Sequence, residues 1–286
     1  LPPALAVAHA LARVLVFRKI HAVFGGRVKY LLCGGAPMPM HLLEFFEAVG
    51  LLILEGYGLT ETVAPVAVNR AERYKLGTVG QLIPGMTARL AEDGELLLKG
   101  KGLFQGYYRD PAATAAAIDG AGWFHTGDIA SIDAEGFITI TDRKKDLIIT
   151  AGGKNVAPQN IEERIRALPL VSQAVVCGDG RKYLTAIVTL DAEEVRALGG
   201  REDRRAGESG LPADHPDIRR IVEDHIASVN AGLAPHERIR RFRILPRDFT
   251  EEAGELTPTL KIRRREISRR YEDVIESLYA DPPAAP

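Results

Sequence analysis

The segment GYGLTET, residues 56–62, combines side chains that could act on a phosphorylated ligand. It follows an apolar run, and its two glycines leave room at the end of a buried strand, where α/β sheets bind ligands. Thr60 offers a hydroxyl donor, Glu61 a carboxylate suited to Mg²⁺, and Tyr57 an aromatic face for a base. Taken alone, the segment is equally well explained as an ordinary polar turn.

Three further segments carry side chains of the same chemical kind. In GWFHTGDIA, residues 122–130, Asp128 could accept two hydroxyl protons from a ribose diol, although Gly-Asp pairs often form simple Asx turns. In DRKKDLIITAGGKN, residues 142–155, Arg143 is a forked donor for phosphate or ribose oxygens, and Gly152-Gly153 predicts a turn that a ligand can approach closely. A solvated charged hairpin is an equally simple explanation of residues 142–155. In ELTPTLKIRR, residues 255–264, Lys261 alone would be interpreted as a surface lysine.

The elements that must position these side chains begin with a β-α-β order. Residues 28–33 predict a buried strand before Gly34-Gly35, residues 40–49 predict a helix, and residues 51–54 predict a second buried strand that ends at Gly56. This order is typical of a three-layer α/β domain.

From residue 78 onward the pattern changes. Two strand pairs with turns at residues 93–94 and 135–136 predict a β-rich subdomain. A charge run at residues 142–146 indicates a domain boundary. Beyond it we expect a smaller α/β domain, with a polar loop over residues 201–214, a helix that starts near Pro158, strands at 171–178 and 183–190, and helices at 215–231 and 263–279.

Composition excludes some classes of protein. The chain has 286 residues and a formal net charge of −1, which argues against a general nucleic-acid binder. Cys33 and Cys177 lie in apolar runs and are expected to be buried strand thiols in a reducing compartment. Charged residues interrupt the apolar N-terminal stretch, so we expect a helix packed on protein, with an amphipathic membrane-surface helix as the alternative.

The order and spacing of all these motifs resemble the adenylate-forming ligase superfamily along nearly the whole chain. The motifs are GGAP at residues 34–37, GYGLTET, GWFHTGD, DRKKDLI with its Gly-Gly pair, and TPTLK. HTGDIA, DRKKDLIITAGGKNVAP and LTPTLKIRR are most similar to long-chain fatty acyl-CoA synthetases. The resemblance implies a mixed α/β fold made of the C-terminal part of the large adenylating domain, residues 1–143, and a small mobile C-terminal domain, residues 144–286.

The same resemblance implies an activity. A fatty acid carboxylate would attack the α-phosphate of MgATP, and the CoA thiol would then attack the acyl-AMP. Lys261, Thr60 and Glu61 would be catalytic, Glu61 would hold Mg²⁺, and Lys145 would be the hinge between the two steps. The residues implied to bind ATP, AMP or CoA are Gly34, Gly35, Ala36, Pro37, Tyr57, Gly58, Thr60, Asp128, Arg143, Gly152 and Gly153.

One part of the family pattern is not found in this sequence. A Ser/Thr/Gly-rich loop ending in Pro-Lys, which would hold the β- and γ-phosphates, does not precede Gly34. We therefore expect a fragment whose partner is the missing N-terminal half of the same enzyme, in the cytoplasm or peripherally at the inner face of the membrane. Two alternatives remain: a non-catalytic fragment that binds AMP or CoA, and an adenylating ligase for another carboxylic acid.

Overall fold

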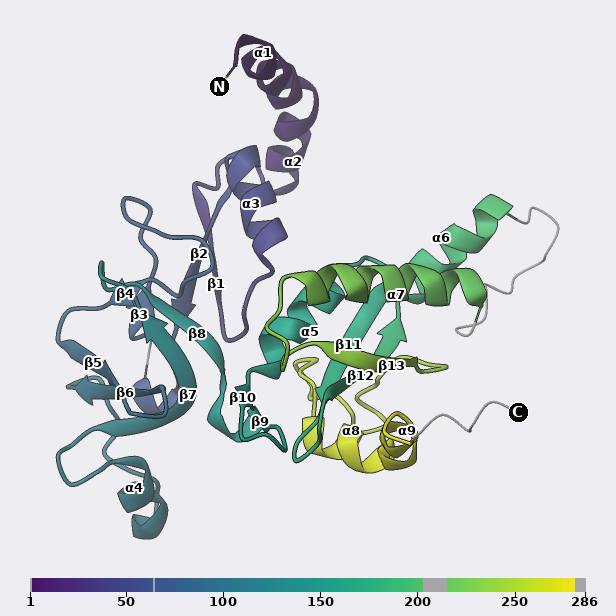
Figure 1. The fold of residues 1–286 in the computed structure, drawn as a ribbon. Coiled ribbons are helices and arrows are strands. Elements are labelled where there is room, and N and C mark those ends of the chain that lie inside the picture. The colour runs from purple at the N-terminus through teal and green to yellow at the C-terminus, as the bar shows by residue number, and fades with distance from the viewer. Residues whose placement is uncertain (1, 64, 203–214, 281–286) are drawn as a thin grey trace. The chain divides into compact units, whose positions relative to one another are not determined.

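The chain divides into two compact units, Leu1–Thr141 (unit 1) and Asp142–Pro286 (unit 2) (Figure 1). The computed structural model describes residues 2–63, 65–202 and 215–280. Both units mix helices and strands, which confirms the predicted α/β class. The polar loop predicted over residues 201–214 lies outside the described residues except for Arg201 and Glu202, which end a helix instead of belonging to a loop.

The first sheet of unit 1 contains the predicted β-α-β order. Its strands, in spatial order, are β1 Tyr30–Gly34, β2 Leu52–Tyr57, β3 Ala67–Val68 and β4 Gln81–Leu82. β1 and β2 are parallel, so the chain must cross over between them, and α3 Met40–Val49 makes that crossover. Gly50 ends α3 in the left-handed conformation at φ 84°, a common stop signal for helices.

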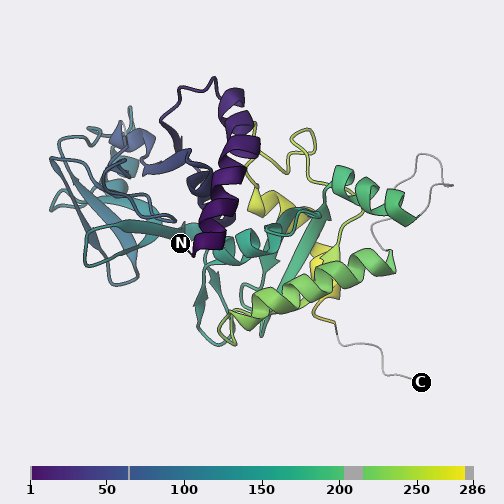
Figure 2. The ribbon, with the colours of Figure 1, turned by 90° about the horizontal axis from the view of Figure 1, so that it is seen from above.

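The N-terminal stretch is helical but does not pack on protein as expected. It consists of α1 Pro3–Ala12, a π-helical turn at Arg13–Phe17 and α2 Arg18–Val23, which run on as one rod (Figure 2). The rod is tied to the rest of unit 1 near its end, where His21 Nε2 lies 2.9 Å from the carbonyl oxygen of Val49. Apolar residues surround the rod and are more than half exposed, among them Leu5, Leu11 and Leu15. No helix among the described residues is long and apolar enough to cross a membrane.

The second sheet of unit 1 is the predicted β-rich part. It is antiparallel, in the order β5 Met86–Leu90, β6 Glu95–Gly100, β7 Phe124–Ile132 and β8 Ile138–Arg143. Gly94 and Gly136 adopt positive φ in the two predicted turns. A short helix, α4 Pro111–Ala117, was not predicted, and Asp110 caps it by accepting a hydrogen bond from the Ala113 N–H at 2.8 Å.

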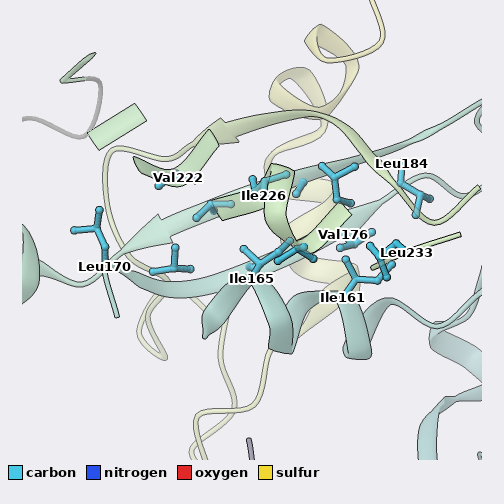
Figure 3. Packing of buried hydrophobic residues seen from close by; sticks show 14 of the residues in the cluster. Ile161, Ile165, Leu170, Val176, Leu184, Val222, Ile226 and Leu233 are labelled. Atoms are coloured by element: carbon cyan, nitrogen blue, oxygen red, sulfur yellow. The ribbon is translucent and has the colours of Figure 1, made fainter. Parts of the chain in front are cut away.

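Unit 2 is a sheet with helices on both faces. The strand order is β11 Val171–Cys177, β12 Leu184–Leu190 and β13 Ile239–Ile244, antiparallel and then parallel. Alternate residues of β12 point to opposite faces: Ala186 and Val188 join one core, and Ile187 joins the other. The first core packs against α5 Pro158–Arg166 and α7 Pro216–Ala231, as Figure 3 shows for Ile161, Ile165, Val222 and Ile226.

The second core of unit 2 packs against the C-terminal helices. The single helix predicted over residues 263–279 is two helices, α8 Arg264–Arg270 and α9 Glu272–Ser277, because Tyr271 leaves the helical conformation at φ −105°. A hairpin of β9 Ile148–Ile149 and β10 Asn155–Val156 precedes α5, and α6 Ala192–Glu202 follows β12. Neither α6 nor β13 was predicted.

Both cysteines lie on strands, as expected, but they are half-buried rather than buried. Cys33 is on β1 and Cys177 on β11, and neither forms a disulfide. Burial raises the pKa of both thiols, to about 12 for Cys177. Neither thiol is therefore activated as a nucleophile.

Candidate functional site

The candidate site of unit 1 starts where β1 and β2 end side by side. Gly34 and Gly56 are paired in the parallel register, and a Cβ on Gly34 would lie 3.0 Å from the Gly56 carbonyl oxygen. Only glycine lets the strands approach this closely without a shift of the backbone. The GGAP and GYGLTET segments consequently leave the sheet at the same edge, where open α/β sheets bind ligands.

Tyr57 and Asp128 are brought together from positions 71 residues apart. Tyr57 ends β2, and its hydroxyl donates a hydrogen bond to the Asp128 carboxylate. Asp128 lies in β7 and is 2% exposed. Its N–H donates to Thr126 Oγ1 at 3.1 Å, and Thr126 in turn donates to the Leu96 carbonyl at 2.7 Å. The GYGLTET and HTGD motifs thus meet at one carboxylate.

Glu95 supports this arrangement, and sequence analysis missed it. It is 3% exposed, and its carboxylate accepts the Gly127 N–H at 2.9 Å and lies 3.2 Å from His125 Nδ1. Both partners precede Asp128 in the HTGD motif. The only local signal is the short run GEL after a turn, which does not predict a partner 30 residues away.

Thr60 and Glu61 lie on a single 3₁₀ turn, Thr60–Thr62, directly after the strand end. Thr62 Oγ1 closes the turn through the N–H and the carbonyl of Leu59, both at 2.8 Å. The Glu61 carboxylate accepts a hydrogen bond from the Tyr107 hydroxyl at 2.8 Å, and the Glu61 carbonyl accepts the Phe104 N–H at 2.7 Å.

Tyr107 is a second residue that sequence analysis missed. Its hydrogen bond to the Glu61 carboxylate raises the pKa of its phenol, so it stays a donor at neutral pH. Phe104 stacks edge-on against both Tyr107 and Phe124, which ties the loop to the core of the second sheet. Glu61 is therefore oriented by a loop 46 residues further along the chain.

Glu61 fits a magnesium site only as one ligand among several. Among the described residues, no group of three His, Cys, Asp or Glu side chains could hold a metal by itself. Mg²⁺ is commonly held in proteins by one or two carboxylates, with substrate phosphates and water completing the octahedron. The chemistry of Glu61 agrees with that arrangement.

Asp142 anchors the start of unit 2, beside the predicted hinge. It is 1% exposed, and its carboxylate accepts the N–H groups of Arg143 at 2.6 Å and Gln159 at 3.0 Å. Gln159 is in the first turn of α5, whose unpaired N–H groups favour an acceptor. Burial nevertheless raises the pKa of Asp142 to about 6. Arg143 and Lys145 follow with exposed side chains, and Lys145 lies in the 3₁₀ turn Lys144–Asp146.

Gly152 and Gly153 form the tip of the β9–β10 hairpin. The Gly153 N–H donates to the Thr150 carbonyl at 2.8 Å, and Gly153 has φ 69°. A Cβ on Gly153 would meet no atom within 4 Å, and one on Gly152 would meet only Thr150 Oγ1 at 3.9 Å. Within unit 2 the tip therefore has open space beside it.

Lys261 lies on a closed loop with its side chain exposed. The Thr257 N–H donates to the Lys261 carbonyl at 2.8 Å, and the Lys261 N–H donates to Thr257 Oγ1 at 3.0 Å. Leu260 completes the turn at φ 59°, an unusual conformation for a residue other than glycine. The structure thus brings Tyr57, Glu61 and Asp128 into one neighbourhood of unit 1, and it places Lys261 on a loop of unit 2.

Comparison with known families identifies both parts of the chain. Residues 3–108 match the model for AMP-binding enzymes, and residues 145–282 match the model for the C-terminal domain of AMP-binding enzymes. The chain is 45% identical over 272 residues to long-chain-fatty-acid–CoA ligase FadD15 of Mycobacterium bovis, and 35% identical over 295 residues to ligase ACSBG1 of Homo sapiens. These matches cover 95% of this chain but only 45% and 41% of the relatives, so the chain spans less than half of their length.

Solved structures of adenylating enzymes share the fold. The adenylation domain of a carboxylate reductase from Mycobacterium chelonae matches with a TM-score of 0.76 at 29% identity, over 95% of this chain and 42% of that one. A two-domain piece of the carboxylic acid reductase from Segniliparus rugosus, solved in complex with AMP, matches with a TM-score of 0.74 at 29% identity, over 94% of this chain and 37% of that one.

Proposed function

Because the chain belongs to the AMP-binding enzymes, we propose that it forms the C-terminal part of a long-chain fatty acid–CoA ligase. The 45% identity over 272 residues to a ligase of that name is the observation that carries the proposal. In the proposed reaction a carboxylate oxygen attacks the α-phosphate of ATP and displaces diphosphate. The CoA thiol then attacks the acyl carbon, and AMP leaves.

In this proposal the sheet edge of unit 1 binds the adenylate. The loop at Gly34–Pro37 lines the adenine and acyl pocket, and the Tyr57 ring stacks near the base beside Gly58. Asp128 accepts hydrogen bonds from the ribose hydroxyls, and Thr60 donates to the α-phosphate. The hydrogen bond between Tyr57 and Asp128 supports this assignment, because it joins the base-stacking group to the ribose acceptor.

Magnesium would be held by Glu61 together with phosphate oxygens and water. When bound, the cation would offset the negative charge of the ATP phosphates. The chain's own contribution is to orient the Glu61 carboxylate, through the turn at residues 60–62 and the hydroxyl of Tyr107.

Unit 2 supplies the groups that act during the two steps. The Lys261 ammonium offsets charge that builds between the attacking carboxylate and the α-phosphate, a purely electrostatic role. Arg143 binds ribose or phosphate oxygens, and the tip at Gly152-Gly153 lines the path of the pantetheine chain. We place the functional boundary between residues 143 and 144, with Lys145 as the hinge that absorbs the backbone change between steps.

A non-catalytic fragment that binds AMP or CoA is the second candidate. One observation favours it: the chain spans 45% of the length of the ligase it resembles. An adenylating enzyme for another carboxylic acid is a third candidate, and the fold shared with carboxylic acid reductases favours it.

Palmitoyl-CoA formation by the purified chain tests the proposal with two sets of substrates. One set contains palmitate, MgATP and CoA; the other contains synthetic palmitoyl-AMP and CoA. We expect product from palmitoyl-AMP, because the second step needs no grip on the diphosphate, and slower product from the first set, whose first step depends on that grip. Absence of product from both sets would favour the binding fragment, and equally fast product from both would show that the phosphate loop is dispensable. Replacing palmitate and palmitoyl-AMP with benzoate and benzoyl-AMP separates the third candidate.

A further inference from the structure

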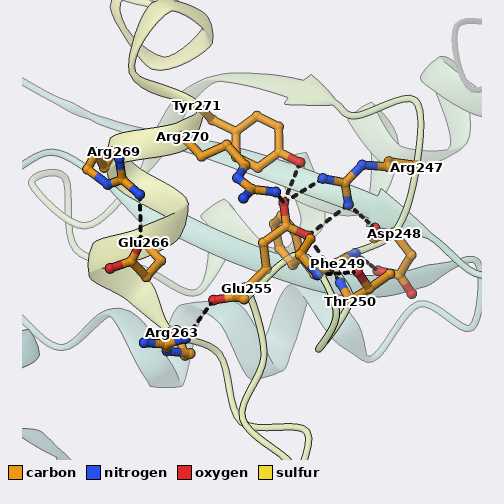
Figure 4. A network of polar contacts seen from close by, with 12 residues as sticks. Arg247, Asp248, Phe249, Thr250, Glu255, Arg263, Glu266, Arg269, Arg270 and Tyr271 are labelled. Atoms are coloured by element: carbon orange, nitrogen blue, oxygen red, sulfur yellow. Dashed lines mark hydrogen bonds and ion pairs between the residues drawn. The ribbon is translucent and has the colours of Figure 1, made fainter.

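Glu255 is a fully buried carboxylate that lies six residues before Lys261 (Figure 4). Both of its oxygens accept hydrogen bonds from Arg247, each at 2.7 Å. Its other donors are the Thr250 N–H at 3.1 Å, the Tyr271 hydroxyl at 2.9 Å and Arg270 Nη1 at 3.3 Å. A two-pronged arginine pair of this kind is directional as well as strong, and the extra donors satisfy the remaining lone pairs.

These five contacts close the stretch after β13 on itself and join it to the junction of α8 and α9. Arg247 and Thr250 belong to the stretch that follows β13, and Arg270 and Tyr271 lie where α8 gives way to α9. Burial by itself raises the pKa of Glu255, but the Arg247 pair and the hydrogen bonds from Thr250 and Tyr271 outweigh it and lower that pKa to about 2. The carboxylate is therefore ionised at neutral pH. The carboxylate itself is buried while its two arginine partners are partly exposed, so removing a partner would leave a buried charge less well compensated.

The two ends of the Lys261 loop meet at the main chain of Glu255. The Glu255 carbonyl accepts the Arg263 N–H at 2.8 Å, and Leu256 and Ile262 form an isolated β-bridge. Residues 256–262 therefore form a closed loop whose base is Glu255, with its turn at residues 258–260 and Lys261 directly after that turn, paired with Thr257. Leu256 is 8% exposed and packs in the second core with Ile267, which holds the base of the loop in place.

We propose that Glu255 is a positioning residue that fixes loop 256–262 and, through it, the place of the Lys261 ammonium. Glu255 touches no substrate; it acts by holding the base of the loop against Arg247 and Tyr271. The proposal rests on the adenylation role assigned to Lys261 above. The structural part of the proposal, that Glu255 holds the loop, rests only on the contacts described above and does not depend on that role.

Glu162 provides a matched control elsewhere in unit 2. It is also a buried carboxylate, 4% exposed, and it accepts hydrogen bonds from Arg264 Nη2 at 2.7 and 2.8 Å. It additionally accepts the Val176 N–H at 2.7 Å, so it joins α5, β11 and α8 rather than the two ends of the loop. Replacing either glutamate with glutamine removes one carboxylate charge that is buried and paired with an arginine.

Hydrogen exchange of the 286-residue chain tests the structural half. In Glu255→Gln we expect the amides of Thr257, Lys261 and Arg263 to exchange at least about tenfold faster, because charged hydrogen bonds at the loop base are lost. The amides of β12 should keep their protection, and Glu162→Gln should leave the three loop amides unchanged. Loop protection that is unchanged in Glu255→Gln, or lost equally in β12, would overturn the proposal.

Tyr271→Phe keeps the test decisive if Glu255→Gln does not fold. It removes one donor and leaves the Arg247 pair intact, so it should speed exchange at the same three amides to a smaller extent. No change at those amides in a folded Tyr271→Phe variant would likewise count against the proposed role of Glu255.

The two half-reactions test the functional half. Glu255→Gln should lower kcat for formation of palmitoyl-AMP with little change in KM for ATP, and it should leave thioester formation from supplied palmitoyl-AMP intact. Equal loss of both steps would show a merely structural role. If the unsubstituted chain forms no palmitoyl-AMP, the adenylation role proposed for this chain fails, while the exchange experiment still decides whether Glu255 holds the loop.

Discussion

Lys261 is presented by a loop rather than by a helix or strand, and its backbone is hydrogen-bonded to Thr257 within that loop. Substitution of the side chain keeps both of these backbone hydrogen bonds. We predict that Lys261→Ala lowers the rate of acyl-AMP formation by about 10²–10³, the usual cost of losing a group that stabilises transition-state charge.

Thioester formation from palmitoyl-AMP should be unaffected by that substitution. The measurement is diphosphate release for the first step and palmitoyl-CoA release for the second, with the exposed Lys182→Ala as the control. Equal loss of both steps in Lys261→Ala would remove the proposed role.

The raised pKa of Asp142 predicts how the stability of the chain depends on pH. Burial raises its pKa from 3.8 to about 6 in the folded chain, so folding favours its protonated form. The stability that this group contributes is present below about pH 4 and is lost as the pH rises through 6, by up to about 3 kcal/mol. In Asp142→Asn this part of the pH dependence should be absent.

Denaturant unfolding of both proteins between about pH 4 and 7 measures that difference. The wild-type chain should lose free energy of unfolding relative to Asp142→Asn across this range. Glu255 does not interfere, because its pKa is lowered from 4.5 to about 2: its stabilisation is present above pH 4.5 and is lost only as the pH falls toward 2. Parallel curves for the two proteins would refute the assignment to Asp142.

Functional residues that lie in a sequence motif were predicted. Residues that are brought to the site only by the fold were missed. Tyr57, Glu61 and Asp128 stand in compact motifs, so their chemistry could be inferred directly. Tyr107 and Glu95 act on partners at least 30 residues away, and their own neighbourhoods carry no comparable pattern. Pairing across a sheet or between a loop and a turn is a tertiary property, which local periodicity does not contain.

At the scale of elements, substitutions of the two glycines in the β9–β10 hairpin can distinguish backbone strain from ligand contact. Gly153 has φ 69°, so Gly153→Ala should cost about 1–2 kcal/mol of stability. Gly152 is not at positive φ and has room for a methyl group, so Gly152→Ala should stay within about 0.5 kcal/mol of the parent. If the tip lines the pantetheine path, both substitutions should still raise KM for CoA.

Steady-state thioester formation from palmitoyl-AMP at varied CoA concentration measures that effect, and denaturant unfolding measures the strain. A KM for CoA that stays constant in both variants would take the hairpin out of the CoA path. Raised KM in Gly153→Ala alone would assign the effect to backbone strain instead.

Elements with a strong period or clear stop signals were predicted well. Helix α3 begins and ends at the predicted residues, and α7 and the two turns of the second sheet also agree. β13 was missed because adjacent arginines break the alternation of its short sequence, IRRFRI, which lies in a charge-rich stretch. The predicted 263–279 helix is broken at Tyr271. The Tyr271 hydroxyl donates a hydrogen bond to Glu255, a tertiary contact that the helical period of the sequence does not reveal.

At the scale of the whole molecule, the exposed N-terminal rod is the feature that most affects behaviour in solution. Leu5, Leu11 and Leu15 are 51%, 58% and 62% exposed, and so much exposed apolar surface is uncommon on a soluble protein. The isolated chain should therefore bind hydrophobic dyes and self-associate. Replacing the three leucines with serine should reduce both effects and leave AMP affinity unchanged, because the leucines belong to the rod, whereas Tyr57 ends β2 and Asp128 lies in β7.

Dye fluorescence and sedimentation velocity of the triple variant check this expectation. Dye binding equal to that of the parent chain would show that another surface is responsible. A loss of AMP affinity in the triple variant would show that the rod supports the sheet edge.

The most direct test of the account is a calorimetric titration of the 286-residue chain with AMP and with 2′,3′-dideoxy-AMP. We predict that AMP binds about tenfold or more tightly than the dideoxy nucleotide, because Asp128 accepts hydrogen bonds from the ribose hydroxyls. In Asp128→Ala the two nucleotides should bind equally weakly, while the exposed control Glu92→Ala keeps the difference. Equal affinities in the unsubstituted chain, or a preference for AMP that survives Asp128→Ala, would contradict the adenylate site placed at this sheet edge.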